Sequence, residues 1–215
     1  MLDPFVLEGR FVRLEPLSES HVDELVDAAN EDRSSYGWTY VPDGHDEMLQ
    51  FVRTAHTKVA ASQHVAFATV ALGSGGGRVV GSTRFCELGF WQWPPGAAHQ
   101  RDGIPDVTDI GFTFLAGSAQ RTAINTEAKL LMMTHAFDVW NVHRVALQTD
   151  VRNSRSRAAI ERIGGRLDGI LRADRPGADD TVRTSARFSI LAAEWPGVRA
   201  RLTARFGAGP QVPST

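Results

Sequence analysis

The sequence is poor in cysteine, and its basic residues are almost all arginine. Cys86 is the single cysteine, which excludes a framework of intrachain disulfides and is typical of a reducing compartment. No histidine stands beside it, so we predict a packed core residue rather than a nucleophile. The arginines are scattered along the chain, which indicates a coding bias rather than a phosphate-binding patch.

Long apolar runs and a strong net charge are also absent. No apolar run approaches the roughly 20 residues that a membrane-spanning helix needs. The first residues, 1–4, show neither a basic start nor an apolar core of a signal peptide. A formal net charge of -2 favours neither nucleic acid nor an anionic membrane as a partner. We therefore expect a cytoplasmic, soluble protein that binds no nucleic acid and no membrane.

The length and composition favour one folded unit. With 215 residues, 42% of them hydrophobic, the chain can bury a full core. We expect residues 1–206 to form a single domain and the Gly- and Pro-rich residues 207–215 to be a disordered tail. The seven histidines show no metal-ligand spacing, so no metal is expected.

Hydrophobic periodicity predicts strands that alternate with helices, which is typical of the α/β (α+β) class. The glycine run at 73–77 leads into a strand and lacks the Gly-Lys-Ser/Thr of a phosphate loop, so we predict a hairpin turn there. The predicted strands are 11–14, 65–71, 79–88, 109–115, 144–149, 165–172 and 187–191. The predicted helices are 18–29, 46–61, 125–140, 153–163 and 194–205.

The junction at 119–129 carries the most information about function. Before it, alternation places Ile110, Phe112 and Phe114 on one face of a strand and Asp109, Gly111 and Thr113 on the other. After it, apolar residues recur at helical spacing: Ala128, Leu131, Met132, His135, Ala136 and Val139. Such a strand, loop and helix presents free N–H groups and a positive helix end that can hold a pyrophosphate. An ordinary capped helix start remains the alternative, with Glu127 pairing with an arginine or lysine in the first turn.

Two stretches resemble a known family. The residues Gln120-Arg121-Thr122-Ala123-Ile124-Asn125 align with a Gln/Arg-x-x-Gly-x-Gly/Ala motif, and Asn153-Ser154-Arg155-Ser156 with an Asn-x-x-Ser motif that opens a short helix. Their order and spacing resemble the GCN5-related N-acetyltransferase (GNAT) superfamily, in the branch of ribosomal-protein N-terminal acetyltransferases, over roughly residues 8–195. Ala123 and Asn125 depart from the small motif residues, and Gly165 stands where the branch usually has an aromatic residue.

The resemblance implies a fold and a cosubstrate. It implies a single domain with a mixed sheet of about seven strands, flanked by helices and splayed between the fourth and fifth predicted strands. It also implies acetyl-CoA as the cosubstrate, its pantetheine arm against the main chain of Phe114 and Leu115. The amides for the pyrophosphate would come from Gln120, Arg121, Thr122, Ala123, Ile124 and Asn125. Asn153 would face the pantetheine, although its type also suits a helix N-cap.

Two residues are candidates for catalysis. Asp109 stands where the branch usually carries Glu and is the candidate general base, with Glu87 in reserve; a structural pairing of Asp109 with an arginine is equally open. Ser156 aligns with a serine that serves the departing thiolate in related enzymes. A serine hydroxyl is too weak an acid for full proton transfer, so we expect a hydrogen bond at most, or a plain first-turn residue.

The aromatic loops suggest an acceptor pocket. Tyr36 and Trp38 lie in the loop at 36–42, and Trp91 and Trp93 in the long loop at 89–106. Together with Glu87 they are the predicted substrate pocket, while a hydrophobic lid or a homodimer contact is as well supported.

The resemblance thus implies an N-acetyltransferase that passes the acetyl group of acetyl-CoA directly to a primary amine, either a peptide N-terminus or a small molecule. Two alternatives stay open: a non-catalytic acyl-CoA-binding or regulatory domain, and an acyltransferase that uses a longer acyl-CoA. A fold does not choose among acceptors.

Overall fold

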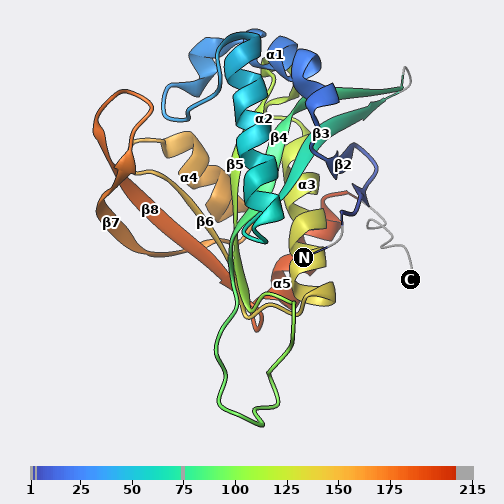
Figure 1. The fold of residues 1–215 in the computed structure, drawn as a ribbon, viewed down its shortest axis with the longest axis vertical. Helices are drawn as coiled ribbons and strands as arrows, with labels where there is room; N and C mark the ends of the chain where they lie inside the picture. Colours follow the sequence, from blue (N-terminus) through green and yellow to red (C-terminus); the bar gives the residue numbers. More distant parts are fainter. Residues whose placement is uncertain (1, 3, 74–75, 207–215) are drawn as a thin grey trace.

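The computed structural model describes residues 2, 4–73 and 76–206, so the predicted tail at 207–215 lies outside the described residues. The described chain forms an eight-stranded sheet in the order β1-β2-β3-β4-β5-β6-β8-β7 (Figure 1). Its strands are β1 (Leu7–Glu8), β2 (Val12–Pro16), β3 (Val65–Gly73), β4 (Gly76–Gly89), β5 (Val107–Leu115), β6 (Arg144–Asp150), β7 (Arg166–Pro176) and β8 (Val182–Leu191). Neighbours pair antiparallel except β5 and β6, which are parallel.

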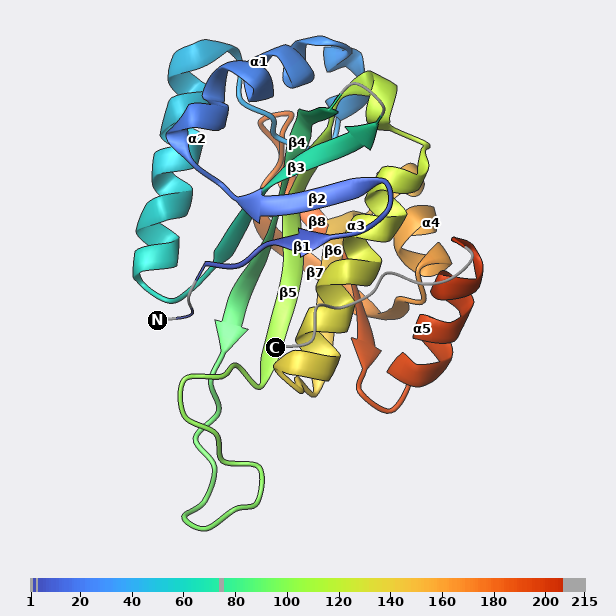
Figure 2. The same cartoon turned by 90° about the vertical axis from the view of Figure 1, so that its right-hand side faces the viewer.

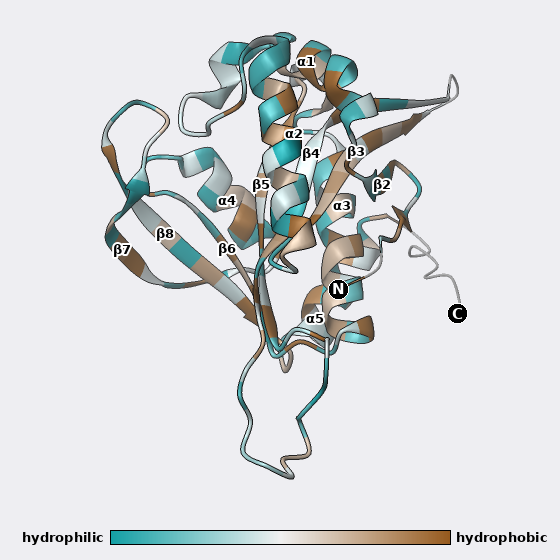
Figure 3. Cartoon of the chain, in the orientation of Figure 1, coloured by the Kyte–Doolittle hydropathy of each residue, from teal (hydrophilic) through white to brown (hydrophobic). Residues whose placement is uncertain are grey.

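Helices cover both faces of the sheet. Figure 2 shows α1 and α2 on one side of the strands and α3 and α5 on the other. The helices are α1 (Val22–Asn30), α2 (Gly44–Ala60), α3 (Ala123–Thr134), α4 (Ser154–Arg162) and α5 (Trp195–Ala204), with short turns η1 (Glu19–His21), η2 (Arg33–Tyr36), η3 (Gly117–Ala119) and the π turn η4 (His135–Val139). Hydrophobic residues concentrate on the central strands, as a sheet buried between two helical layers requires (Figure 3). The predicted mixed α/β class is confirmed.

The elements differ from their predicted bounds where burial is low. The sheet has eight described strands rather than about seven because the two-residue β1 precedes the first predicted strand. β8 begins at Val182 and β7 runs to Pro176, both beyond the predicted ends. Most of β7 is exposed, so its sequence carries little hydrophobic alternation. The predicted hairpin is confirmed by the pairing of Gly73 with Gly76.

The predicted helix at 125–140 divides into two parts. α3 begins at Ala123 and ends at Thr134, where the π turn η4 follows. Val139 was predicted on the apolar face, but 51% of its surface is exposed. A π turn adds a residue per turn, which rotates the last apolar position away from the sheet.

A β-bulge breaks the predicted alternation of β5. Ser82 pairs with Phe114 but Arg84 with Gly111, so β5 has one extra residue opposite Thr83. Phe112 has a φ of 50°, in the left-handed region. Ile110 consequently packs in the core under α3, and Phe114 in the core under α1 and α2, while Phe112 is 48% exposed. The predicted single face of Ile110, Phe112 and Phe114 is therefore wrong, because the bulge reverses the side-chain direction.

The sheet is open between β5 and β6. The two strands pair only at residues 107–109 and 144–146, and beyond Asp109 β5 pairs with β4 alone. Beyond Ala146, β6 pairs with β8 alone and leans away from β5 with it (Figure 1). The predicted splay between the fourth and fifth predicted strands is confirmed. We refer to the opening between β5 and β6 as the gap.

Candidate active site

The predicted pyrophosphate cradle lies at the end of β5, on the loop that leads into α3. Thr122 is the N-cap of α3: its Oγ1 accepts from the Ile124 N–H at 3.3 Å and donates to the Ala119 carbonyl at 2.7 Å. Ala123 and Asn125 both lie in the first turn of α3, and neither has a positive φ. The left-handed residue is Arg121, with a φ of 62°. The two departures from the family glycines thus fall where no glycine conformation is required.

The main chain of β5 faces the gap at Leu115. The Ala116 N–H donates to the Val80 carbonyl of β4 at 2.7 Å. Successive residues of a strand direct their N–H and C=O groups to opposite edges, so Phe114 also faces β4 and Leu115 faces the gap. The polar groups of Phe114 belong to the β4 ladder, so of the two predicted main-chain contacts Leu115 is the one whose polar groups face the gap, and the contacts themselves stay predictions.

The Leu115 carbonyl already has two donors. The hydroxyl of Tyr36 in η2 lies 2.8 Å from it, and Nε2 of Gln120 lies 2.9 Å from it. Burial raises the pKa of Tyr36, so the phenol stays protonated at neutral pH and donates. The N–H of Leu115 remains its main-chain group for a ligand in the gap. Tyr36 was predicted as a pocket residue, but its contact with Leu115 was not, because the two residues are 79 apart in the sequence.

Side chains from three elements meet at the open end of the gap. Nη2 of Arg155 in α4 donates to Gln120 Oε1 and to the Ser35 carbonyl, both at 3.1 Å. Nε2 of Gln120 also donates to the Ser35 hydroxyl at 2.8 Å. Arg155 was not predicted as a site residue, because its partners are distant in the sequence.

Asn153 caps α4 on the β6 side of the gap. Its Oδ1 accepts from the Ser156 N–H at 2.9 Å, which confirms the capping alternative. Ser156 is a half-buried residue in the first turn of α4. A cap and a ligand contact can coexist on Asn153, so its predicted role toward the pantetheine stays a prediction, as does the role of Ser156.

Asp109 lies at the closed end of the gap, at the last position where β5 and β6 pair. It is 5% exposed, and Nη2 of Arg187 lies 3.2 and 3.3 Å from its two carboxylate oxygens. Burial raises its pKa, and the nearby Glu87 adds to this, while Arg187 and Arg144 oppose it. The predicted pairing with an arginine is confirmed. Burial makes the carboxylate a stronger base than an exposed aspartate, so the role as general base stays open.

The five predicted pocket residues do not come together. η2, with Tyr36, and the adjacent Trp38 segment lie at one end of the molecule, and the loop between β4 and β5 protrudes from the opposite end in both views (Figures 1 and 2). Trp38 lies 4.0 Å from the Arg152 guanidinium. In the protruding loop, Trp91 stacks on His143 at 5.3 Å, and Trp93 Nε1 donates to Asp106 at 2.9 Å. The prediction of one pocket is wrong. The loop at 89–106 lies at the Val107 end of β5, whereas Tyr36 contacts Leu115 at the other end, so the length of β5 separates the two loops.

The buried carboxylate of Glu127 has partners that the sequence did not reveal. Glu127 is 1% exposed, and its carboxylate accepts the N–H groups of Arg10, Phe11 and Val12 at 2.9, 2.6 and 3.0 Å. The predicted pairing with arginine or lysine is wrong, since the carboxylate points to the start of β2. Cys86 is buried beside Gly111, as predicted, and burial raises its pKa to about 12.

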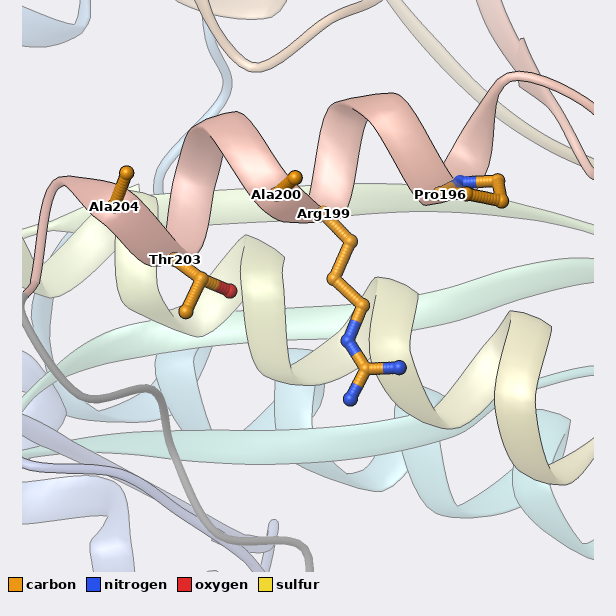
Figure 4. A pocket seen from close by; sticks show the side chains of 5 residues that line it. All are labelled: Pro196, Arg199, Ala200, Thr203 and Ala204. Atoms are coloured by element: carbon orange, nitrogen blue, oxygen red, sulfur yellow. The ribbon is translucent and has the colours of Figure 1, made fainter.

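A shallow hollow also lies along α5, lined by Pro196, Arg199, Ala200, Thr203 and Ala204 (Figure 4). It contains no residue of β5, β6 or α4 and is separate from the gap. Within the described ranges, no group of three or more His, Cys, Asp or Glu residues is arranged to hold a metal ion. No helix among the described residues is both long and apolar enough to cross a membrane.

Comparisons with known proteins agree with this geometry. A GCN5-related N-acetyltransferase from Brucella melitensis is 27% identical, covers 96% of this chain and 87% of its own, and superposes with a TM-score of 0.77. RimJ of Mycobacterium smegmatis, solved with CoA-disulfide, is 17% identical over 97% of this chain and 98% of its own, with a TM-score of 0.76. The Microcin C7 self immunity acetyltransferase MccE, solved with acetyl-CoA and AMP, is 14% identical over 84% and 92%, with a TM-score of 0.69.

The last two structures share the fold at low identity. No curated protein matches the sequence. The family model described as acetyltransferase (GNAT) domain matches residues 12–166, which is more than half of the chain. The chain therefore belongs to the GNAT acetyltransferase family, as its two motifs predicted.

Proposed function

We propose that the chain is an N-acetyltransferase that passes the acetyl group of acetyl-CoA directly to a primary amine. The observation that carries this proposal is the gap between β5 and β6, which opens beyond Asp109 and ends beside the first turn of α3. A gap of this kind exposes main-chain polar groups inside a sheet, where a linear ligand can add as a strand would.

The residues around the gap suit coenzyme A. The first-turn N–H groups of α3 and the positive end of its dipole favour a pyrophosphate, and Gln120 to Asn125 would hold it. The Leu115 N–H and the side chain of Asn153 would lie along the pantetheine. When bound, acetyl-CoA supplies the acetyl group as a thioester. Arg155 adds positive charge at the open end of the gap.

The proposed chemistry gives a task to each of the two candidate catalytic residues. The amine must be neutral to attack a carbonyl, and Asp109 at the closed end would accept its proton, directly or through water. Burial, which raises the pKa of Asp109, favours this role. Ser156 would donate a hydrogen bond to the departing thiolate.

The acceptor is proposed to be a peptide N-terminus or a small-molecule amine. RimJ and a structure from Vibrio cholerae described as a ribosomal-protein-serine acetyltransferase share the fold, which supports a place in the branch of ribosomal-protein acetyltransferases. Tyr36 and Trp38 would contact the acceptor, while Trp91 and Trp93 fit a lid or a homodimer contact. We further propose a cytoplasmic protein whose residues 1–206 form a single domain.

Thiol release from acetyl-CoA tests the proposal, with peptide N-termini, polyamines, aminoglycosides and amino acids as acceptors. Buried Cys86, with its raised pKa, should add little background to a thiol reagent. Release that requires one acceptor class would support the proposal. Binding of acetyl-CoA without turnover would favour a non-catalytic domain, and turnover only with longer acyl-CoA would favour the third alternative. Failure to bind any acyl-CoA would refute all three.

A further inference from the structure

Lys129 is a buried lysine that the proposed chemistry leaves without a task. It projects from α3 toward the sheet and is 5% exposed. Its Nζ donates to Thr83 Oγ1 of β4 at 2.9 Å and to Thr113 Oγ1 of β5 at 2.8 Å. The two hydroxyl oxygens lie 2.8 Å apart, so the three polar atoms form a closed triangle.

The charge of Lys129 is bonded to hydroxyls and not to a carboxylate. Glu127 of the same helix is bonded to the amides of β2, and Asp109 of β5 is paired with Arg187. Arg84 of β4 stacks on Phe51 of α2, on the other side of the sheet. Burial lowers the pKa of Lys129 to about 7, and the nearby Cys86 of β4 opposes this shift. Burying a lysine amine without a counter-ion costs folding free energy, whether the amine stays charged or loses its proton, so stability alone does not account for Lys129.

The triangle is attached to the bulge of β5. Thr113 directly follows Phe112, the left-handed residue at the bulge. The Thr113 hydroxyl also lies 3.3 Å from the Gly111 carbonyl, so it bridges the bulge from one side to the other. A left-handed conformation is strained for a residue that is not glycine, and it persists where its surroundings hold it. Lys129 of α3 and Thr83 of β4 hold the Thr113 hydroxyl on the face of the sheet that α3 covers.

The Thr113 carbonyl faces the gap. It belongs to the same peptide group as the Phe114 N–H, which is directed to β4, and the two polar groups of one peptide point to opposite edges. The side chain held by Lys129 and a main-chain group that faces the gap thus belong to one residue. Any shift of the hydroxyl moves the peptide group that a ligand in the gap would meet.

We propose that Lys129 is a positioning residue for acetyl transfer: by holding the Thr113 hydroxyl, it fixes the main chain of the β5 bulge toward the thioester carbonyl. This inference rests on the proposed function. An oxyanion in the gap would accept a hydrogen bond from a main-chain N–H whose placement decides the rate. A lysine suits the triangle because its ammonium is compact, whereas a guanidinium is planar and larger.

The test compares Lys129→Met, Thr113→Val and the double variant with the wild-type protein. Lys58→Met is the matched control, since Lys58 is exposed on α2 and bonds to Gln63. We expect Lys129→Met to lower kcat about tenfold to a hundredfold while KM for acetyl-CoA changes less than about twofold. The melting temperature should stay equal or rise, because a buried charge has been replaced by an apolar chain. The double variant should be no worse than either single variant.

Hydrogen exchange of the free protein gives a second readout that needs no cosubstrate. We expect the amides of residues 110–115 to exchange about tenfold faster in Lys129→Met and Thr113→Val, and to be unchanged in Lys58→Met. Unchanged exchange or unchanged kcat in Lys129→Met would overturn the inference. So would a fall in kcat accompanied by an equal loss of cosubstrate affinity and a lower melting temperature, because that is a purely structural role. A wild-type protein that acetylates nothing would refute the proposed function instead, and hydrogen exchange would still decide whether Lys129 holds the bulge.

Discussion

The two halves of β5 differ in whether their main-chain polar groups are paired on both edges of the strand or on one. Residues 107–109 pair with β4 and β6 and end at Asp109, whose charge is matched by Arg187. Residues 110–115 pair with β4 alone, contain the bulge at Phe112, and are held by Lys129, which has hydroxyl partners only. The closed half stabilises the sheet, and the open half leaves main-chain groups free for a ligand. One strand can do both because β6 leaves it after three residues.

The largest expected effect comes from the boundary between the two halves. Asp109→Asn should lower kcat by about 100-fold or more, because an amide cannot accept the proton of the attacking amine. Affinity for acetyl-CoA should change less than about threefold, since the carboxylate lies at the closed end of the gap. Steady-state kinetics and calorimetric titration measure the two quantities. Asp168→Asn in β7, where the carboxylate accepts from Ser189, is the matched control. Equal activity in Asp109→Asn would remove this residue from the mechanism.

The charge partner of the closed half should set the pH dependence. Arg187 lowers the pKa of Asp109 against the effect of burial, so Arg187→Met should raise that pKa further. Asp109 can act as a base only while it is deprotonated. With a higher pKa it is protonated already at higher pH, so the acid limb of the kcat/KM profile should move to higher pH in the variant. The limb should disappear in Asp109→Asn. A pH profile from pH 4 to 8 checks this, and an unmoved limb would show that another group titrates.

On the β6 side of the gap, the cap and the ligand contact of Asn153 can be separated. Asn153→Ala should lower the free energy of unfolding by about 1 kcal/mol, since the Ser156 N–H loses its acceptor. Asn153→Asp keeps a capping oxygen and should retain most of that stability. If Asn153 also contacts the pantetheine, both variants should bind acetyl-CoA more weakly. Chemical denaturation measures the effect on stability, and calorimetry measures the effect on affinity. Equal affinity for acetyl-CoA in the wild type and both variants would show that Asn153 acts only as a helix cap.

The smallest effect is expected beyond the open half, at the altered family motif. Ala123→Gly restores the family residue, yet it should change the affinity for acetyl-CoA by less than about threefold, because Ala123 already has an ordinary helical conformation. A tenfold tighter complex would instead mean that the alanine methyl group obstructs the ligand. Calorimetric titration of acetyl-CoA into the two proteins distinguishes these outcomes.

Much of the fold followed from local patterns. The central strands β3, β4 and β6 are buried runs rich in apolar residues, the hairpin after Gly73 is marked by glycines, and the motifs at Gln120 and Asn153 predicted the family. Exposed elements were predicted less well, because β7 and the start of β8 bury little and so carry little periodicity. The faces of β5 were mispredicted at Phe112, since a bulge inserts a residue without a marker such as glycine.

The candidate site divides in the same way. Asp109 and the cradle could be located from their places on β5 and directly after it. Arg155 and Lys129 could not, and neither could the contact of Tyr36 with Leu115, because the partners come from distant elements and each is an ordinary residue in its own segment. The sequence also predicts that the two aromatic loops are neighbours, but they leave opposite ends of the sheet.

The sequence by itself determined the order of strands and helices, the family, and the loop on which a pyrophosphate would rest, since periodicity, turn residues and helix starts are local properties of the chain. Only the tertiary structure decided at which residue β5 and β6 separate, which of Phe114 and Leu115 directs its main chain to the gap, and that Lys129 is buried against Thr83 and Thr113. These features depend on which edges and side chains meet across the sheet, and such long-range contacts leave no periodic trace in the amino-acid order.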